Sequence, residues 1–561
     1  MSTASTKSRD SRSLRPAGRG AGKKSKAGAA LPPTPVMPEI SPRVYRWASL
    51  AILAAAAFLR LYQLALKPMH HDEGVNGFFL TNLYRQGLYH YDPSNYHGPT
   101  LYYFADGVAK LNALLFGEPG LSTGAVRLVT ALFGIATVLL VLTLRRYIGA
   151  LGALAAAALL AVSPGNVFIS RYFIHESLFV FFTLALVVAA LRYYETAHPL
   201  YLMLASASAG LLFATKETAI ISAGVLLIAW GLTVVYLRIS GRGAGSARER
   251  GQGSRGKSSG RGRRHEPEPA ALSRFGNRTD IALVALTALA VFVFVNVVFY
   301  SSFFTYWKGV TGALESFQFW AKTGSKDHTF QGPLGYVNWL LQEEAPLLLL
   351  GAVGAVLAVV RARNRFAVFA GLWAFGILAA YSLIPYKTPW LMLNFTVPLA
   401  IIGGYAVGEI YGWSQSLRPR LLALALVFAA LVIGSTQAVI LSFFRYDDDR
   451  YPYVYAHTQR ELLSLVDNIK RLAERAGTGT KTPITITSAE YWPLPWYVRD
   501  YGHAGFYGQL TANAGPIVVG SEAQEPELKA MLGEDYQRVG AYALRPSVQL
   551  VLYARKALLE R

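Results

Sequence analysis

Long apolar stretches alternate with short polar connections along most of this chain. A helix of about 20 apolar residues crosses the roughly 30 Å hydrocarbon core of a bilayer, and runs of about that length recur here. The pattern predicts eleven membrane-spanning helices, at residues 44–64, 124–144, 150–167, 170–192, 200–214, 219–237, 281–300, 345–360, 366–384, 391–410 and 421–443.

Two regions depart from this pattern. Residues 100–116 are only moderately apolar and contain Asp106 and Lys110, so they predict a helix lying at the membrane interface. Beyond residue 445 the chain is polar. That part is expected to hold an amphipathic helix at 458–476 and short strands at 483–487, 516–519 and 548–554.

The fold expected from these elements is mainly α: a polytopic membrane helical bundle with a small α/β domain. The bundle takes residues 44–445, and the C-terminal domain takes 446–561 on the outer side of the membrane. Composition supports this class, because 53% of the 561 residues are hydrophobic and only 16% are charged. The chain has no cysteine, which excludes disulfides and thiolate chemistry.

The net charge of +21 is concentrated in two segments. Residues 1–46 carry ten Lys/Arg against two acidic residues, and 238–278 carry eleven against three. Both are poor in large apolar residues, so residues 1–43 and 238–278 are expected to be a disordered cytoplasmic tail and loop. Binding to anionic lipid is favoured. An RNA-binding tail is the alternative, but no aromatic residues interleave the arginines.

The stretch richest in side chains that could take part in catalysis or bind a metal is MHHDEGVNG, at 69–77, directly after the first predicted span. Asp72 and Glu73 would lie at the boundary between water and membrane, where a carboxylate could act as a general base. Together with His71 and His97, Glu73 could instead bind a divalent metal ion. The alternative is a solvated pair that caps a helix beginning near Gly74.

Further charged residues recur at the same predicted depth. Arg171 and Glu176 lie at the outer end of the fourth span, Lys216 lies between the fifth and sixth, and Lys387 between the ninth and tenth. If Arg171, Lys216 and Lys387 converge, they would form an anion site suited to a lipid-linked phosphate. The alternatives are interfacial ion pairing for Arg171 and Glu176, and snorkelling for the two lysines.

These motifs, in this order, resemble membrane glycosyltransferases of the GT-C class, in particular protein O-mannosyltransferases and the aminoarabinose transferases of lipid A. The resemblance covers about 44–445. It is carried by Asp72-Glu73, by His97-Gly98-Pro99 before an interfacial helix, and by Ser170-Arg171 with Glu176. Ala214-Thr215-Lys216 and a looser match at Lys387-Thr388-Pro389-Trp390 complete it. HHDEGVNG and YDPSNYHGPTLYY are closer still to the flippase activity-associated proteins. Where the family has a Pro-Pro pair, this chain has Gly98-Pro99, so that glycine replaces one proline.

The resemblance implies transfer of a sugar from a polyprenyl-phosphate donor to an acceptor hydroxyl, with inversion at the anomeric carbon. Asp72 would then be the general base, and Glu73 would orient it or hold a metal. Lys216, Arg171 and Lys387, with Glu176, would bind the donor phosphate. The loop at 301–344 would cover the site, and Trp492 and Trp496 could stack on sugar faces. The acceptor would be a protein, a lipid or a glycan, and no nucleic acid partner is expected.

Two other functions remain open. A lipid-linked sugar flippase would place ionisable residues through the middle of the membrane, whereas a non-catalytic assembly factor for surface glycans would tolerate Asp72→Asn. Charge asymmetry predicts a multi-pass plasma-membrane protein with a cytoplasmic N-terminus and an outward site.

Overall fold

The computed structural model describes residues 40–560, apart from 96, 118–119, 241–277 and 326–330. The predicted basic tail and the predicted basic loop lie almost entirely outside these residues. Eight of the described helices are long and apolar enough to cross a membrane. They are α1 (Pro42–Leu61), α4 (Thr123–Thr143), α8 (Glu176–Thr196), α10 (Ala219–Ile239), α12 (Arg278–Tyr300), α16 (Arg365–Leu383), α17 (Leu393–Tyr411) with the short η4 (Pro389–Met392), and α18 (Leu417–Val439) with its continuation η5 (Ile440–Phe444).

Two further predicted spans are bent helix pairs. α6 (Ala150–Val162) continues into α7 (Pro164–Ser170) at a 57° bend, and α14 (Gly335–Glu343) meets α15 (Ala345–Arg361) at 112°. The first bend falls at Pro164, because proline is tolerated at the start of a helix but not inside one. Counting each pair as one span gives ten among the described residues, against eleven predicted. The difference is α9 (Pro199–Phe213), whose 15 residues reach only about 22 Å.

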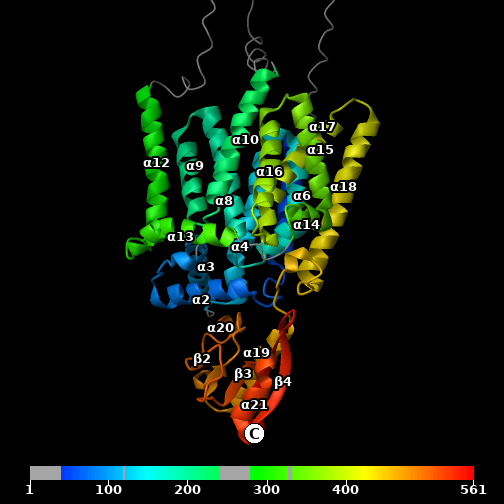
Figure 1. Cartoon of the computed structure of the whole chain (residues 1–561). Helices are drawn as coiled ribbons and strands as arrows, with labels where there is room; N and C mark the ends of the chain where they lie inside the picture. Colours follow the sequence, from blue (N-terminus) through cyan, green and yellow to red (C-terminus); the bar gives the residue numbers. More distant parts are fainter. Residues whose placement is uncertain (1–39, 96, 118–119, 241–277, 326–330, 561) are drawn as a thin grey trace, which may run out of the picture. The chain divides into compact units, whose positions relative to one another are not determined.

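The centre of the bundle is α17, whose apolar window is entirely buried in the protein. It packs against α15, α6, α16 and α18, and small residues such as Gly354 and Gly404 allow close backbone approach there. By contrast, the window of α12 is not buried at all and carries exposed Leu283, Leu286 and Phe294. Figure 1 shows α12 at the edge of the row of upright helices. An exposed apolar helix face of this kind is suited to contact with the lipid tails of a bilayer.

The connection between the first two spans is helical. The predicted loop that begins at Met69 contains α2 (His71–Gln86), followed by η1 (Pro93–Asn95) and α3 (Thr100–Phe116). The helix predicted at residues 100–116 is confirmed as α3, and its place at the membrane interface stays a prediction. α2 agrees with the alternative of a helix that begins near Gly74. Figure 1 shows α2 and α3 lying across one end of the upright helices. The predicted long loop at 301–344 likewise contains a helix, α13 (Lys308–Gly324), besides α14.

The C-terminal part is a small α/β domain, as predicted. Helix α19 (Glu461–Arg475) packs Leu465 and Ile469 on the sheet. The sheet order is β2-β1-β3-β5-β4, with β1 parallel to β2 and β3, and β5 antiparallel to β3 and β4. The strands are β1 (Ile484–Ile486), β2 (Ala504–Phe506), β3 (Ile517–Ser521), β4 (Tyr536–Arg545) and β5 (Val548–Arg555). The prediction missed β2, which is three residues long, and β4, which has few fully buried positions.

Candidate functional site

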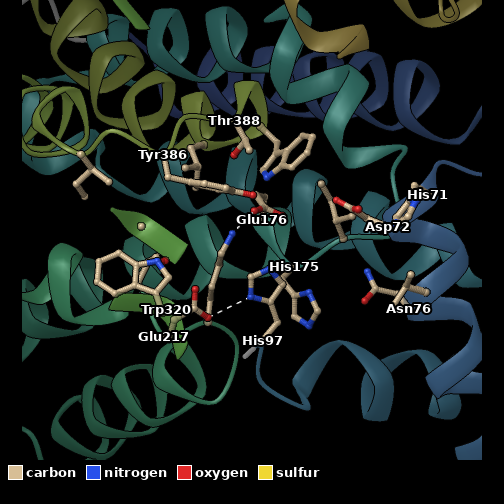
Figure 2. Close-up of a pocket in the computed structure, with 18 of the residues that line it drawn as sticks. His71, Asp72, Asn76, His97, His175, Glu176, Glu217, Trp320, Tyr386 and Thr388 are labelled. Atoms are coloured by element: carbon tan, nitrogen blue, oxygen red, sulfur yellow. Dashed lines mark hydrogen bonds and ion pairs between the residues drawn. The ribbon is translucent and has the colours of Figure 1, made fainter. Parts of the chain in front are cut away.

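A cavity of about 290 Å³ lies where the interfacial helices meet the ends of the spans. His71, Asp72 and Asn76 of α2 line one side (Figure 2). The other sides come from the turns before α8 and α10, from α13, and from the segment between α16 and α17. Those turns and segments contribute His175, Glu176, Lys216, Glu217, Trp320, Tyr386 and Thr388, and the connection between α2 and α3 contributes His97.

The first turn of α2 is fixed by its own cap. Nδ1 of His70 accepts the Asp72 N–H at 3.1 Å, and the Glu73 carboxylate accepts the His70 N–H at 2.9 Å. These two bonds form a capping box, which satisfies backbone donors that a helix start leaves free. The Asp72 carboxylate is 42% exposed, and among the residues that the structure describes only His70 Nδ1 lies in ion-pair range, at 3.9 Å. Burial lowers the pKa of His70, so this imidazole is neutral at pH 7 and does not neutralise Asp72.

Glu73 has a different environment. It is fully buried, and Arg127 binds it with two bonds of 2.7 Å, while the Phe173 N–H donates to Oε1 at 2.7 Å. Burial alone would raise the pKa of Glu73, but the Arg127 guanidinium holds it below its ordinary value. Glu73 does not line the cavity. This corrects the expectation of direct catalytic or metal contact and leaves the other expectation, that Glu73 orients Asp72.

Arg127 joins this site to the bundle. Besides Glu73, it donates to the carbonyls of Leu64, Lys67 and Pro68 at 2.9 to 3.2 Å. Arg127 is fully buried, and sequence reasoning missed it. An arginine inside an otherwise apolar predicted span was a usable signal. The pairing of Arg127 with Glu73 was not readable, because 54 residues separate them.

Lys216 lines the cavity, and its side chain is paired. Its Nζ donates to Glu176 at 2.5 Å. Burial disfavours the ammonium, yet Glu176 and Glu217 more than offset this and raise the pKa of Lys216. Glu217 in turn lies 3.1 Å from Nδ1 of His97. Lys216 is the single Lys or Arg among the cavity residues that the structure describes.

The turn that carries Lys216 is held to the α2–α3 connection by backbone contact. The Gly98 N–H donates to the Thr215 carbonyl at 3.0 Å, and the Thr100 N–H to the Ala214 carbonyl at 3.3 Å. A side chain at Gly98 would collide with the Ala214 carbonyl, so only glycine fits. His175 completes this corner: its Nε2 lies 3.0 Å from the Gly98 carbonyl, which can only accept. Nε2 therefore carries the proton, and Nδ1 is left as an acceptor.

Arg171 and Lys387 do not line the described cavity. Arg171 donates to four carbonyls, those of Leu59, Arg60, Tyr62 and Gln63, at the end of α1. Lys387 donates to the carbonyls of Ser382 and Ile384. The expected convergence of three cations is therefore corrected, because backbone carbonyls at helix ends engage two of them.

The expected metal ligands are not gathered either. Within the described residues, no group of three or more His, Asp or Glu side chains is placed to hold a metal ion. Glu73 is occupied by Arg127, and His97 faces Glu217. Nδ1 of His71 lies 3.3 Å from Nη1 of Arg545. A metal on Nε2 of His71 would move the proton to Nδ1, toward a guanidinium that can only donate. These residues do not fit a metal.

Trp492 and Trp496 lie where the C-terminal domain contacts α2. Trp496 is 2% exposed, its ring packs where a Cβ at Gly77 would stand, and its Nε1 donates to Thr123 at 3.1 Å. Its predicted role in stacking on a sugar is therefore corrected to that of a packing residue. Trp492 is half-buried, with its ring centre 6.1 Å from that of His71.

Part of the chain matches a known protein family. Residues 97–244 match the family model described as dolichyl-phosphate-mannose-protein mannosyltransferase. No curated protein sequence matches the chain.

Solved structures match over most of the chain. ArnT from Cupriavidus metallidurans, in the apo state and bound to undecaprenyl phosphate, has a TM-score of 0.54 at 14% identity, covering 92% of this chain and 99% of ArnT. An oligosaccharyltransferase from Archaeoglobus fulgidus, solved with Zn and sulfate, has a TM-score of 0.52 at 14% identity, covering 89% and 73%. The closer likeness to flippase activity-associated proteins stays a prediction. The chain therefore has the ArnT-like GT-C fold, and its resemblance to GT-C membrane glycosyltransferases is confirmed.

Proposed function

We propose that this protein is an inverting glycosyltransferase that moves a sugar from a polyprenyl-phosphate donor to an acceptor hydroxyl. One observation carries the proposal most directly. Of the three carboxylates that line the described cavity, Glu176 and Glu217 are buried against Lys216 and His97, whereas Asp72 is partly exposed beside a neutral imidazole. Asp72 is therefore the one placed to accept a proton from a bound ligand.

In the proposed reaction, Asp72 takes the proton of the acceptor hydroxyl while the oxygen forms a bond to the anomeric carbon. The bond from that carbon to the phosphate oxygen breaks on the opposite face, and its electron pair leaves with the lipid phosphate. Lys216 stabilises the developing charge on the phosphate, since two of its three N–H donors remain after the bond to Glu176. Figure 2 shows Asp72 on the opposite side of the cavity from Glu217, the neighbour of Lys216.

The comparisons support the proposed class of donor. ArnT has been solved with undecaprenyl phosphate, and the description of the matching family names dolichyl-phosphate-mannose. The same Archaeoglobus oligosaccharyltransferase has been solved with a tethered acceptor peptide, which supports a macromolecular acceptor such as protein, lipid or glycan. We place the site on the outer face of the plasma membrane. The connection between α17 and α18 lies at the end of the bundle away from α2 (Figure 1), and Arg418 and Arg420 follow it in the first turn of α18, as the positive-inside rule requires.

A lipid-linked sugar flippase is less well supported. Such a protein would need ionisable residues along a path through the membrane. In the described spans, the charged side chains cluster toward the helix ends instead. Arg60 lies in the last turn of α1, Arg127 in the second turn of α4 and Glu176 at the start of α8, while Arg361 and Glu409 pair near the opposite end of the bundle.

The test is transfer of a radiolabelled sugar from a panel of polyprenyl-phosphate donors by the purified full-length protein. Wild type should transfer, and Asp72→Asn should bind donor without turnover. If no donor and acceptor pair supports transfer, or if Asp72→Asn turns over like wild type, the proposal is wrong.

A further inference from the structure

Arg545, the last residue of β4, contacts a cavity-lining histidine from the C-terminal domain. Its Nη1 lies 3.3 Å from Nδ1 of His71, and the same guanidinium forms an ion pair with Glu490. His71 precedes Asp72 in the first turn of α2, and both line the cavity (Figure 2). The C-terminal domain therefore touches the residue next to the proposed base.

This contact fixes the proton on His71. A guanidinium has donors only, so Nδ1 of His71 must accept, and the neutral ring then carries its proton on Nε2. Burial lowers the pKa of His71, and Arg545 lowers it further, against Asp72 and Glu490 which raise it. The neighbouring His70 has a pKa that burial also lowers. Nε2 of His71 makes no hydrogen bond to any residue that the structure describes, so its N–H is available to a ligand.

We propose that His71 donates its Nε2–H to the oxygen of the acceptor hydroxyl while Asp72 accepts that hydroxyl's proton, and that Arg545 is the positioning residue that fixes His71 in this form. The inference rests on the proposed function and deepens it. A hydroxyl has one proton and two lone pairs: the proton goes to Asp72, one lone pair takes the His71 N–H, and the other attacks the anomeric carbon. The oxygen is thereby held in place at both its donor and its acceptor positions.

The proposal assigns opposite hydrogen-bonding roles to two histidines that line the cavity, His71 and His175. His175 has its Nε2–H bonded to the Gly98 carbonyl and keeps an acceptor at Nδ1, whereas His71 keeps a donor at Nε2. A residue that merely fills space beside Asp72 would not need a fixed tautomer. The arrangement therefore predicts which amide substitutions preserve function.

The first test compares His71→Gln with His71→Asn in the full-length protein, using the donor and acceptor of the wild-type transfer assay. The amide nitrogen of Gln can occupy the position of Nε2, whereas that of Asn reaches only the position of Nδ1. We expect His71→Asn to lower kcat/KM for the acceptor about tenfold, the size of one hydrogen bond to a reacting group, and His71→Gln to retain most of it. Donor binding should not change in either variant. Equal activity of the two variants would overturn the proposal.

The second test uses the pH profile of Arg545→Leu, with Arg538→Leu as the matched control. Arg538 lies on the same strand and pairs with Glu525 away from the cavity. Removing Arg545 removes a cause that lowers the pKa of His71. His71 then protonates at higher pH and pairs with Asp72, so the acidic limb of the rate profile should move to higher pH. A limb that stays where it is in Arg538→Leu would overturn the role of Arg545.

The two proposals fail in different ways. If wild type transfers no sugar from any donor, the proposed function falls and this inference falls with it. The inference alone is wrong if wild type transfers sugar, the two His71 variants are equally active, and the pH profile of Arg545→Leu matches that of Arg538→Leu.

Discussion

On the α2 side of the cavity, Asp72 keeps a carboxylate that is 42% exposed and has a neutral histidine nitrogen 3.9 Å away. On the side formed by the turns before α8 and α10, Glu176 and Glu217 are buried and each contacts a nitrogen at 2.5 to 3.1 Å. The first arrangement suits a group that must gain a proton during a reaction. The second holds charge in place. The proposed base, Asp72, therefore lies on one side of the cavity, and the ion-paired carboxylates Glu176 and Glu217 lie on the other. The following changes test this difference between the two sides.

The largest effect is expected at Asp72. Asp72→Asn removes the proton acceptor while preserving size, and general-base catalysis contributes about 10²- to 10⁴-fold. Turnover should fall by that factor with donor binding and thermal stability unchanged. Asp467→Asn, on the exposed face of α19, is the control and should have wild-type turnover. Wild-type turnover in Asp72→Asn would remove the distinction between the two sides.

The next effect concerns stability. Arg127→Met leaves Glu73 buried without its partner, and breaking a buried ion pair in this way costs about 3–5 kcal/mol. Thermal unfolding in detergent should show a large loss. The double variant Arg127→Met with Glu73→Gln should recover part of it, because residue 73 then carries no charge that needs the arginine. A double variant less stable than Arg127→Met would contradict the structural role given to Glu73.

Lys216 should show an intermediate effect. Lys216→Met removes the ammonium proposed to stabilise the leaving phosphate, so donor affinity and turnover should each fall by roughly ten- to a hundredfold. Lys216→Arg keeps a positive charge and should retain more activity. Binding of polyprenyl phosphate without a sugar provides the measurement, since it isolates the phosphate contact. Unchanged phosphate binding in Lys216→Met would place the phosphate elsewhere.

The smallest effect concerns the docking of the C-terminal domain. A Cβ at Gly77 would come within 2.5 Å of the Trp496 ring, so Gly77→Ala should destabilise the protein by about 1–3 kcal/mol. Gly107→Ala is matched to it: the position is also helical, but nothing lies within 4 Å of a Cβ there. That control should be neutral or about 1 kcal/mol more stable. Melting temperatures of the two variants check this, and equal values would contradict tight docking on α2.

The fold could be predicted from hydrophobic patterning because each predicted span coincides with a described helix or bent pair. Asp72 could be singled out because a carboxylate directly after a span is costly unless it is used or paired. The pairing itself could not be predicted. Glu73 looked equivalent to Asp72, and Arg171 looked equivalent to Lys216. The difference lies in partners about 50 to 110 residues away along the chain, Arg127 for Glu73 and the carbonyls at the end of α1 for Arg171.

Trp496 shows the same limit from the other direction. An aromatic, proline-rich segment in a polar domain suggests carbohydrate binding, and nothing local reveals that Gly77 leaves room for the Trp496 ring on α2. The small β2 and the largely unburied β4 were missed because three residues, or a strand with few buried positions, give little periodic signal.

The backbone bonds between Gly98 and Thr215, and between Thr100 and Ala214, have a consequence for the protein in different bilayers. Membrane helices tilt to match bilayer thickness, and a site built only from their ends would widen or narrow as they do. Here the turn carrying Lys216 is tied to the segment between α2 and α3, which lies across the helix ends. The distance from the Lys216 turn to the α2–α3 connection is therefore set by a short stretch of paired main chain, and we expect it to stay constant when the thickness of the surrounding lipid changes.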